Sequence, residues 1–343
     1  MNWEQLDWDA LDRLRGGFLS GTAANGPYWN SLSDLANYDL TYAERIGWKW
    51  DSLLNELRLR HWQPPAGGVL LDWGCGSGVA GRRALSAFGP ESFSSLAVWD
   101  HSEHARAFAV TRAREVFPAL EVSEFADTGQ RIALLVVSHV LNELPADART
   151  QLLALVERAE AVIWIEPGTH ADSRALAALR DQLRPGHRIV APCTHHADCP
   201  LFQAANERDW CHFFAPPPVG IQNHPGWVRF AQRVGIDLRN QAYSCLVLDR
   251  ADAPQQAQLP DNAARVLGRA EVFKPYARFL ACEASGLHEL ELPKRVAPAL
   301  VKQLDKNPPI PLYALTHDGK RVITMDPLVV ESTTSADEEH PCA

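Results

Sequence analysis

Residues 69–88 limit the possible folds more than any other part of the chain. Residues 69–72, Val-Leu-Leu-Asp, have the composition of a short buried strand and lead directly into Gly74-Cys75-Gly76-Ser77-Gly78. A helix is expected through residues 82–88. Glycines allow a sharp turn and a close approach to a ligand, and the amino end of the following helix directs free N–H groups at it. The segment is therefore typical of an α/β domain that binds a nucleotide-like cofactor at this loop.

The alternation of apolar strand and helix continues along the chain. Residues 132–138 are continuously apolar, as the central strands of a parallel sheet are. Further strands are expected at 96–100, 120–125, 161–166, 187–191 and 244–249, and helices at 103–117, 148–158, 172–183 and 227–234. Repeated strand–helix alternation predicts a doubly wound, mostly parallel sheet.

The regions around this pattern differ from it and suggest four parts. Residues 1–65 have a mainly helical pattern, with one helix expected at 43–62. Residues 66–250 contain the sheet, with an insertion at 192–224 that is rich in Cys, His and Pro. Residues 251–330 are expected to form a small β-rich lobe. Residues 331–343 form an acidic tail that is expected to be disordered.

Two acidic residues help to choose among the cofactors that use such a loop. Asp72 ends the first strand, where a carboxylate would repel a pyrophosphate but suits the amino-acid end of S-adenosylmethionine. Asp100 ends the second strand, where an acid can hold both ribose hydroxyls by charge-assisted hydrogen bonds. The segment thus resembles the class I (Rossmann-like) S-adenosylmethionine-dependent methyltransferase fold, with nicotinamide binding or a purely structural turn as alternatives. The donor-binding residues expected here are Asp72, Gly74, Cys75, Gly76, Gly78 and Asp100.

Two later strand ends reach the same edge of the predicted sheet. Asp127 follows the third strand, where it is expected to contact adenine or to be an ordinary loop residue. Ser138 and His139 end the fourth strand, at the edge that faces the methyl group. His139, Asn142 and Glu143 are expected to touch donor or acceptor, or to cap the next helix. If the acceptor has to lose a proton, His139 or Glu143 would be the catalytic base.

The cysteines indicate a metal site rather than disulfides. The chain has seven, an odd number, and begins without an export signal, so metal ligation or burial is favoured. Cys193, Cys199 and Cys211 stand within nineteen residues, and Cys282 follows later. Four thiolates can hold zinc or an iron–sulfur cluster, and Cys199 precedes a proline, as one cluster ligand of bacterial ferredoxins does. His195, His196 and His212 are alternative ligands that would favour zinc, whereas Cys75, Cys245 and Cys342 are interpreted mainly as packing residues.

One competing interpretation concerns Pro192-Cys193, which resembles the nucleophilic dipeptide of cytosine-C5 methyltransferases. That dipeptide normally follows the fourth strand, and here the fourth strand ends in Ser138-His139, so we do not favour this interpretation. The Asp/Asn-Pro-Pro-aromatic motif of many amino-group methyltransferases is also absent.

Charge and hydropathy restrict the partners and the location. The net charge of −9 disfavours a non-specific nucleic-acid binder, and no DNA partner is expected. The more basic stretch 265–302 leaves a local RNA-binding face open. No apolar run is long enough for a membrane span, and the acidic N-terminus lacks the pattern of a secretory or mitochondrial leader, so a cytoplasmic, bacterial location is expected.

Together the motifs DWGCGSGVA, SHVLNEL, WIEPGT, APCTHHADCPL, DWCHF and LACEASG resemble the mitochondrial small-ribosomal-subunit methyltransferase-like family and its bacterial relatives, over about residues 40–300. The resemblance implies a [4Fe–4S] cluster held by Cys193, Cys199, Cys211 and Cys282. It also implies association with the small ribosomal subunit during assembly, through its rRNA. The glycine loop of the family matches Asp72, Gly74, Gly76 and Gly78.

Three functions are consistent with these residues. The first is an rRNA methyltransferase, in which catalysis is largely the in-line positioning of an already activated methyl group. The second is a non-catalytic ribosome assembly factor that binds donor and RNA. The third is a zinc-stabilised methyltransferase that acts on a small molecule or a protein.

Overall fold

The structure is a computed structural model that describes residues 2–20, 28–239, 241–254, 259–304, 306 and 310–328. The tail expected to be disordered, 331–343, and Cys342 lie outside the described residues. Within these ranges, no helix is long and apolar enough to span a membrane.

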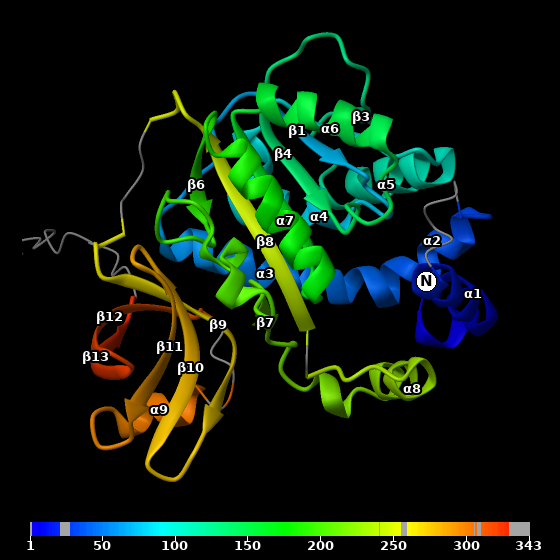
Figure 1. The fold of residues 1–343 in the computed structure, drawn as a ribbon. Helices are drawn as coiled ribbons and strands as arrows, with labels where there is room; N and C mark the ends of the chain where they lie inside the picture. Colours follow the sequence, from blue (N-terminus) through cyan, green and yellow to red (C-terminus); the bar gives the residue numbers. More distant parts are fainter. Residues whose placement is uncertain are drawn as a thin grey trace, which may run out of the picture.

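A twisted sheet forms the centre of the molecule (Figure 1). Its strands are β1 (Val69–Trp73), β2 (Ser95–Trp99), β3 (Val122–Glu124), β4 (Ile132–Ser138), β5 (Ala161–Pro167), β6 (His187–Ala191), β7 (Phe213–Ala215) and β8 (Gln241–Arg250). The order is β3-β2-β1-β4-β5-β8-β6, with β7 also paired to β8. Strands β1 to β5 are parallel, whereas β8 runs antiparallel to β5, β6 and β7. This is the sheet of the class I methyltransferase fold, and it confirms the predicted doubly wound, mostly parallel architecture.

Helices cover both faces of the sheet and account for its two apolar cores. They are α3 (Glu44–Leu59), α4 (Val79–Phe88), α5 (Glu103–Val116), α6 (Ala146–Arg158) and α7 (His170–Leu183). Residues of α3, α4 and α5 pack on one face, where Trp50 and Leu85 are buried. Residues of α6 and α7 pack on the other, with Leu152 and Leu179. The sheet is therefore buried on both sides, as its continuously apolar strands require.

The N-terminal region is helical, as expected, and it packs beside the carboxyl ends of the strands. It contains α1 (Trp8–Ser20), α2 (Leu32–Tyr38) and a π-helical turn, η3 (Asp39–Ala43), that continues into α3. A later helix, α8 (Pro225–Val234), joins it through a cluster that includes Trp48, Trp227 and Phe230. Short 3₁₀ turns occur at η1 (Trp3–Gln5), η4 (Pro90–Ser92), η5 (Pro200–Phe202), η6 (Ala204–Asn206) and η7 (Ile221–Asn223).

The expected β-rich lobe is a closed five-stranded barrel, orange to red in Figure 1. Its strands are β9 (Ala263–Val272), β10 (Tyr276–Glu283), β11 (Gly286–Pro293), β12 (Leu312–Asp318) and β13 (Arg321–Pro327). The closed order is β9-β10-β11-β13-β12, with β11 and β13 parallel and α9 (Pro298–Leu304) between the third and fourth strands. This is the connectivity of an OB-fold, the five-stranded Greek-key barrel. Leu267 of β9 joins the core of the sheet, so the barrel packs directly on the α/β domain.

Candidate functional site

The glycine loop has the backbone conformation that the sequence pattern predicts. Gly74, Gly76 and Gly78 have φ values of +70°, +51° and +79°, a region that favours glycine. A Cβ at Gly74 would lie 2.5 Å from Val140 Cγ1, whereas a Cβ at Gly76 would meet no atom within 4 Å. Gly76 thus faces open space at the position where a bound donor would approach the backbone.

Asp100 fixes this loop against the end of β2. Its Oδ2 accepts a hydrogen bond from the Gly76 N–H (3.0 Å), and its Oδ1 accepts one from the Ser102 N–H (2.9 Å). Burial raises the pKa of the Asp100 carboxyl. Because each carboxylate oxygen can accept more than one hydrogen bond, Asp100 retains acceptor capacity toward the pocket that it lines.

Asp72 lies behind the loop rather than in the pocket. It is buried, its Oδ2 accepts a hydrogen bond from the Gly81 N–H (2.9 Å), and its Oδ1 has no partner. Burial raises its pKa to about 7. In this arrangement Asp72 holds the start of α4, while the pocket wall at the loop consists of Gly74 to Ser77. The expected direct contact between Asp72 and the donor stays a prediction.

We use the name donor pocket for the cavity at the carboxyl ends of β1, β2 and β4. Besides the loop and Asp100, it is lined by Trp99, whose ring stacks on that of Trp73 with the centroids 4.4 Å apart. The N-terminal region, with its helices and the segment before α2, contributes a second wall that sequence patterns did not indicate. Its residues are Phe18, Tyr28, Trp29, Tyr38, Tyr42, Arg45, Ile46 and Lys49. Ser77 also lines the pocket, and its buried hydroxyl has no hydrogen-bond partner in the protein.

Ser138 and His139 lie in the donor pocket, as expected, and His139 has a strained backbone. Its φ is +57°, which is uncommon for a residue other than glycine and is often found at functional sites. Its Nε2 lies 3.0 Å from Lys49 Nζ, and its Nδ1 lies 3.2 Å from Ser138 Oγ. The Trp50 indole N–H donates to the same hydroxyl (3.1 Å). Lys49 and Trp50 of α3 therefore contact His139 and Ser138 at the end of β4, in the donor pocket.

The surroundings of Lys49 and His139 favour the uncharged forms of the Lys49 amine and the His139 imidazole. Burial, followed by the Arg45 charge, lowers the pKa of Lys49 to about 7. Burial and the Lys49 charge also hold the pKa of His139 well below its usual value. Lys49 was not predicted as a site residue, because nothing in the pattern of its helix separates it from a solvated lysine.

Glu143 and Asn142 also line the donor pocket. Burial, and secondarily the Asp100 charge, raise the pKa of Glu143 to about 7. The alternative in which these residues cap the next helix does not match the structure, because the N-cap of α6 is Pro145 and no side chain caps it. The turn is held instead by buried Glu166, which accepts from the Val140 and Leu141 N–H groups (3.2 and 3.1 Å).

The structure does not bring Asp127 to the donor pocket. Its side chain is exposed and pairs with Arg158 at 2.7 Å. Of the two interpretations of this residue, an ordinary loop position agrees with its surroundings.

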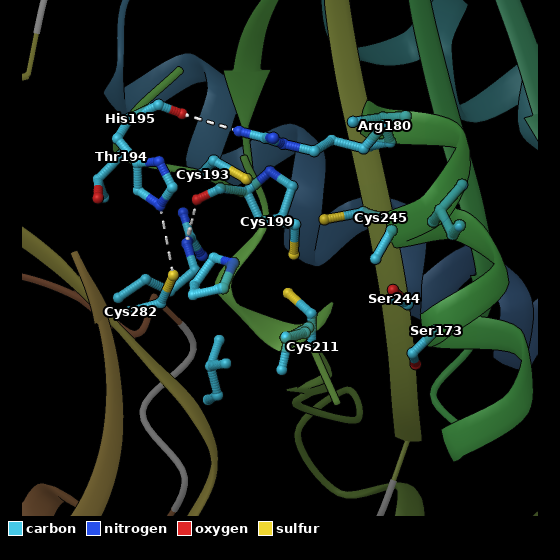
Figure 2. Close-up of a pocket in the computed structure, with 18 residues that line it drawn as sticks. Ser173, Arg180, Cys193, Thr194, His195, Cys199, Cys211, Ser244, Cys245 and Cys282 are labelled. Atoms are coloured by element: carbon cyan, nitrogen blue, oxygen red, sulfur yellow. Dashed lines mark hydrogen bonds between the residues drawn. The ribbon is translucent and has the colours of Figure 1, made fainter. Parts of the chain in front are cut away.

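The four cysteines expected to bind metal converge on one cavity, which we call the cysteine pocket (Figure 2). Cys193 follows β6, Cys199 precedes η5, Cys211 precedes β7 and Cys282 lies on β10 of the barrel. Cys245 of β8, expected to serve only packing, lines the same cavity. Burial raises the pKa of the Cys199 thiol to about 11 and holds that of Cys211 well above its usual value, with neighbouring cysteines adding to both.

The spacing of these sulfur atoms does not suit a single metal ion. A tetrahedral zinc with bonds of about 2.3 Å needs thiolate sulfurs about 3.8 Å apart. Among the described residues, no three cysteine sulfurs lie mutually within 4.8 Å. Of the histidines considered for zinc, only His195 lines the pocket, with its Nε2 3.6 Å from Cys282 Sγ. His196 is exposed and His212 stacks on Trp210, so neither supplies the short contacts of a mononuclear site.

Buried cations surround the cysteine pocket. Arg180 pairs with Asp181 and donates to the His195 carbonyl (3.2 Å). Arg265, which is 2% exposed, pairs with Glu56 and donates to the Pro192 carbonyl. Arg60 also pairs with Glu56, at 2.6 Å. Of these arginines, Arg180 and Arg265 line the pocket itself, where buried positive charge favours an anionic occupant.

The donor pocket and the cysteine pocket are lined by different residues. Pro192 and Cys193 belong to the second, which places no Cys193 thiolate beside the glycine loop. This agrees with our preference against a base-attacking cysteine.

Comparison with known proteins gives one sequence family and several distant structures. The family model described as mitochondrial small ribosomal subunit Rsm22 matches residues 54–291. No curated protein sequence matches the chain. A Pyrococcus horikoshii structure provisionally described as an RNA methyltransferase is 13% identical, with a TM-score of 0.35, over 62% of this chain and 84% of that one. Magnesium protoporphyrin IX methyltransferase from Synechocystis is 14% identical, with a TM-score of 0.38, over 71% and 92%. Similarities this distant add nothing to the fold assignment, which rests on the strand order.

Proposed function

Because this chain belongs to the Rsm22 family of the mitochondrial small ribosomal subunit, we propose that it is an S-adenosylmethionine-binding, [4Fe–4S]-containing protein that methylates rRNA of the small ribosomal subunit. The observation that carries the proposal is the combination of the two pockets in one chain of this family. One is the donor pocket of the methyltransferase fold. The other is the cysteine pocket, whose four proposed ligands include no three sulfur atoms mutually within 4.8 Å.

Donor binding is supported by the features of the donor pocket that lack a partner in the protein. The open space at Gly76, the free Ser77 hydroxyl and the spare acceptor capacity of Asp100 suit the amino-acid and ribose groups of S-adenosylmethionine. When bound, this donor supplies a methyl group already activated by its sulfonium. Trp99 provides an aromatic surface at the adenosine end.

Methyl transfer is supported by the residues at the end of β4. His139 has a strained backbone and contacts Lys49, and Glu143 lies in the same pocket. Lys49 and Glu143 have pKa values near 7 and can accept a proton at neutral pH, which is the role of a general base, whereas His139, with its lowered pKa, is a candidate through its position. We assign this role to Lys49, His139 and Glu143 as a group, because the structure gives no acceptor from which to choose among them.

The cysteine pocket supports a cluster in preference to zinc. A cubane cluster holds each thiolate on a different iron, so its ligands lie farther apart than those of one zinc ion. We propose Cys193, Cys199, Cys211 and Cys282 as the ligands. The surrounding arginines would offset the negative charge of the ligated cluster.

An rRNA partner is supported by a groove on the barrel. Its lining contains three cations and one acid around an aromatic ring, with the residues Pro275, Tyr276, Glu291, Pro293, Lys294, Arg295, Pro298 and Arg321. The Tyr276 ring lies 4.9 Å from that of Phe273, which is exposed. Cations that follow a phosphate backbone beside stacking rings form the usual site for single-stranded nucleic acid. Replacing Tyr276 by Ala should weaken RNA binding by about 1–3 kcal/mol, measured with single-stranded small-subunit rRNA fragments. Equal affinity would exclude this groove.

The enzymatic proposal is tested by mapping methylated nucleotides in small-subunit rRNA. A strain that lacks the gene should lose one mark, which the wild-type gene restores and the Lys49→Met/Glu143→Gln double variant does not. Unchanged methylation in the deletion strain, together with delayed subunit maturation, would establish the non-catalytic assembly factor instead. Colourless anaerobic protein with stoichiometric zinc and no sulfide would overturn the cluster.

A further inference from the structure

Three side chains outside both pockets converge at one end of the barrel. Glu283 is the last residue of β10, His288 lies on β11 and His317 lies on β12. The Nε2 atom of His317 is 2.9 Å from Glu283 Oε1, and the Nε2 atom of His288 is 3.4 Å from the same oxygen. All three ligand atoms lie within 4.8 Å of one another, the only such group among the described residues.

Strand phase explains why these side chains meet. Residues two apart along a strand share one face, and Phe279 and Ala281, two residues apart on β10, lie in the barrel core. Glu283 continues that row. His288 and His317 extend the rows of Leu290 and Leu315 in the same way. The three polar residues are thus the last members of three inward-facing rows, and they close the mouth of the apolar barrel.

We propose that Glu283, His288 and His317 bind one divalent transition-metal ion, with zinc the best match. Two imidazoles and one carboxylate are a recurrent ligand set for such ions. Bonds of about 2.0–2.1 Å in a tetrahedron place neighbouring ligand atoms about 3.3–3.4 Å apart. The distance from His288 to Glu283, 3.4 Å, has this value, and the distance from His317 to Glu283, 2.9 Å, would lengthen by about 0.4 Å on metal binding. The three ligands leave one position of a tetrahedral ion for water or another small ligand.

One neighbouring group orients His317 as metal sites require. His317 Nδ1 lies 2.7 Å from the Gly319 carbonyl, to which it can only donate, so the lone pair of the neutral ring is on Nε2, facing Glu283. Such a carbonyl contact is the common outer support of a ligating histidine. Ser285 Oγ donates to Glu283 Oε1 (2.6 Å), so it accepts from His288 Nε2–H at 2.9 Å, a hydrogen bond that a bound metal would replace. Without a metal, protonated imidazoles would have to fill the same space, and this is the alternative that the experiment must exclude.

The site is separate from the cysteine pocket although it adjoins it in sequence. Cys282 and Glu283 are neighbours on β10, but successive side chains on a strand point to opposite faces. Cys282 packs against the core of the sheet, whereas Glu283 belongs to the inward row of the barrel. A metal at the barrel mouth would therefore fix the tip of the strand that presents Cys282, without sharing a ligand with the cysteines.

The test is a count of zinc bound to the full-length chain, purified anaerobically, loaded with zinc and dialysed against a weak chelator. The wild type should retain one equivalent more than His317→Asn and His288→Asn, with affinity in the variants lower by more than about a hundredfold. Glu289→Gln is the matched control, because this exposed carboxylate lies beside His288 on β11 and pairs outward with Lys320. It should retain the same amount as the wild type.

Cobalt(II) in place of zinc identifies the ligands. The equivalent lost in the histidine variants should show ligand-field bands without a thiolate-to-cobalt charge-transfer band, and circular dichroism should show that the variants are folded. Equal zinc retention in wild type and folded His317→Asn would overturn the proposal. A lost equivalent with thiolate charge transfer would assign the ion to the cysteines and overturn it as well.

Discussion

The donor pocket and the cysteine pocket both lie at the α/β domain, but they are built by different means. In the donor pocket, backbone groups set the geometry: Gly76 and Ser102 N–H groups hold Asp100, and positive φ values shape the loop. In the cysteine pocket, side chains from distant elements surround a space in which no three sulfurs lie mutually within 4.8 Å. The geometry of the first site is set by hydrogen bonds within the protein, whereas the cluster that we propose for the second would join parts that are otherwise separate. The two sites should therefore respond differently to the loss of a single side chain.

The most severe test of this contrast is removal of one cysteine ligand. Structural zinc contributes about 10–16 kcal/mol to the folding of small zinc-binding peptides, so by analogy losing one of four ligands should cost roughly 2.5–4 kcal/mol. Cys211→Ser should lose visible absorbance and acid-labile sulfide and unfold at lower denaturant. Cys245→Ser is the matched control, since this thiol lines the same pocket but is not a proposed ligand. Equal losses in both variants would contradict the four-cysteine assignment.

A smaller effect is expected from the donor pocket, because its framework remains when one contact is removed. Asp100→Ala removes a charge-assisted hydrogen-bond acceptor, which should weaken donor binding by about 1.5–3 kcal/mol, measured by calorimetry. Asp127→Ala is the control, since Asp127 is exposed and outside the pocket. Unchanged affinity in Asp100→Ala would remove the ribose role, and a matching loss in Asp127→Ala would revive its contact with adenine.

The smallest expected effect is the pH dependence that Lys49 gives to stability. Its pKa is lowered from 10.5 to about 7, so between these pH values the unfolded chain holds a proton that the folded chain lacks. The contribution of Lys49 to stability therefore rises with pH through this window, and its cost is fully present below pH 7. Lys49→Met should be more stable than the wild type at pH 6. We expect a difference of about 1 kcal/mol in the free energy of unfolding, because solvent screening of the Lys49 charge reduces the cost of burying it.

Denaturant unfolding at pH 6 and pH 10 checks this prediction, because the advantage of Lys49→Met should disappear at the higher pH. Arg58→Met, on an exposed position of the same helix, is the control and should show no such pH-dependent difference. A constant difference between Lys49→Met and wild type at both pH values would mean that Lys49 titrates as an ordinary solvated lysine.

The features predicted correctly from sequence depend on local patterns. The strand at 69–72, the glycine loop and the alternation that follows are each determined by neighbouring residues, and the sheet confirms them. The four cysteines were grouped by spacing and by resemblance, and they share one cavity. Their cluster remains a proposal.

The features that the sequence did not reveal arise where distant segments meet. Lys49 reaches His139 across 90 residues of chain, and Cys245 reaches the cysteine pocket only because β8 lies between β5 and β6. Closure of the barrel likewise depends on pairing between β9 and β12, which no local pattern records. Asp72 and Asp127 were both placed by their positions next to strand ends. That local pattern did not reveal that Asp72 is buried behind the glycine loop and that Asp127 faces solvent.

The pairing of Glu56 with Arg265 has a consequence for the order in which the protein can be completed. The two residues are separated by 209 positions, although they form a buried ion pair under the cysteine pocket. At synthesis rates of about 5–20 residues per second, the Glu56 carboxylate waits roughly 10–40 s for this partner. During that interval it has Arg60 alone, one helical turn away on the same segment. The face of α3 that carries Glu56 is therefore expected to stay hydrated in a nascent chain until β9 has been synthesised. Burial of this face would then be completed only when β9 packs against it.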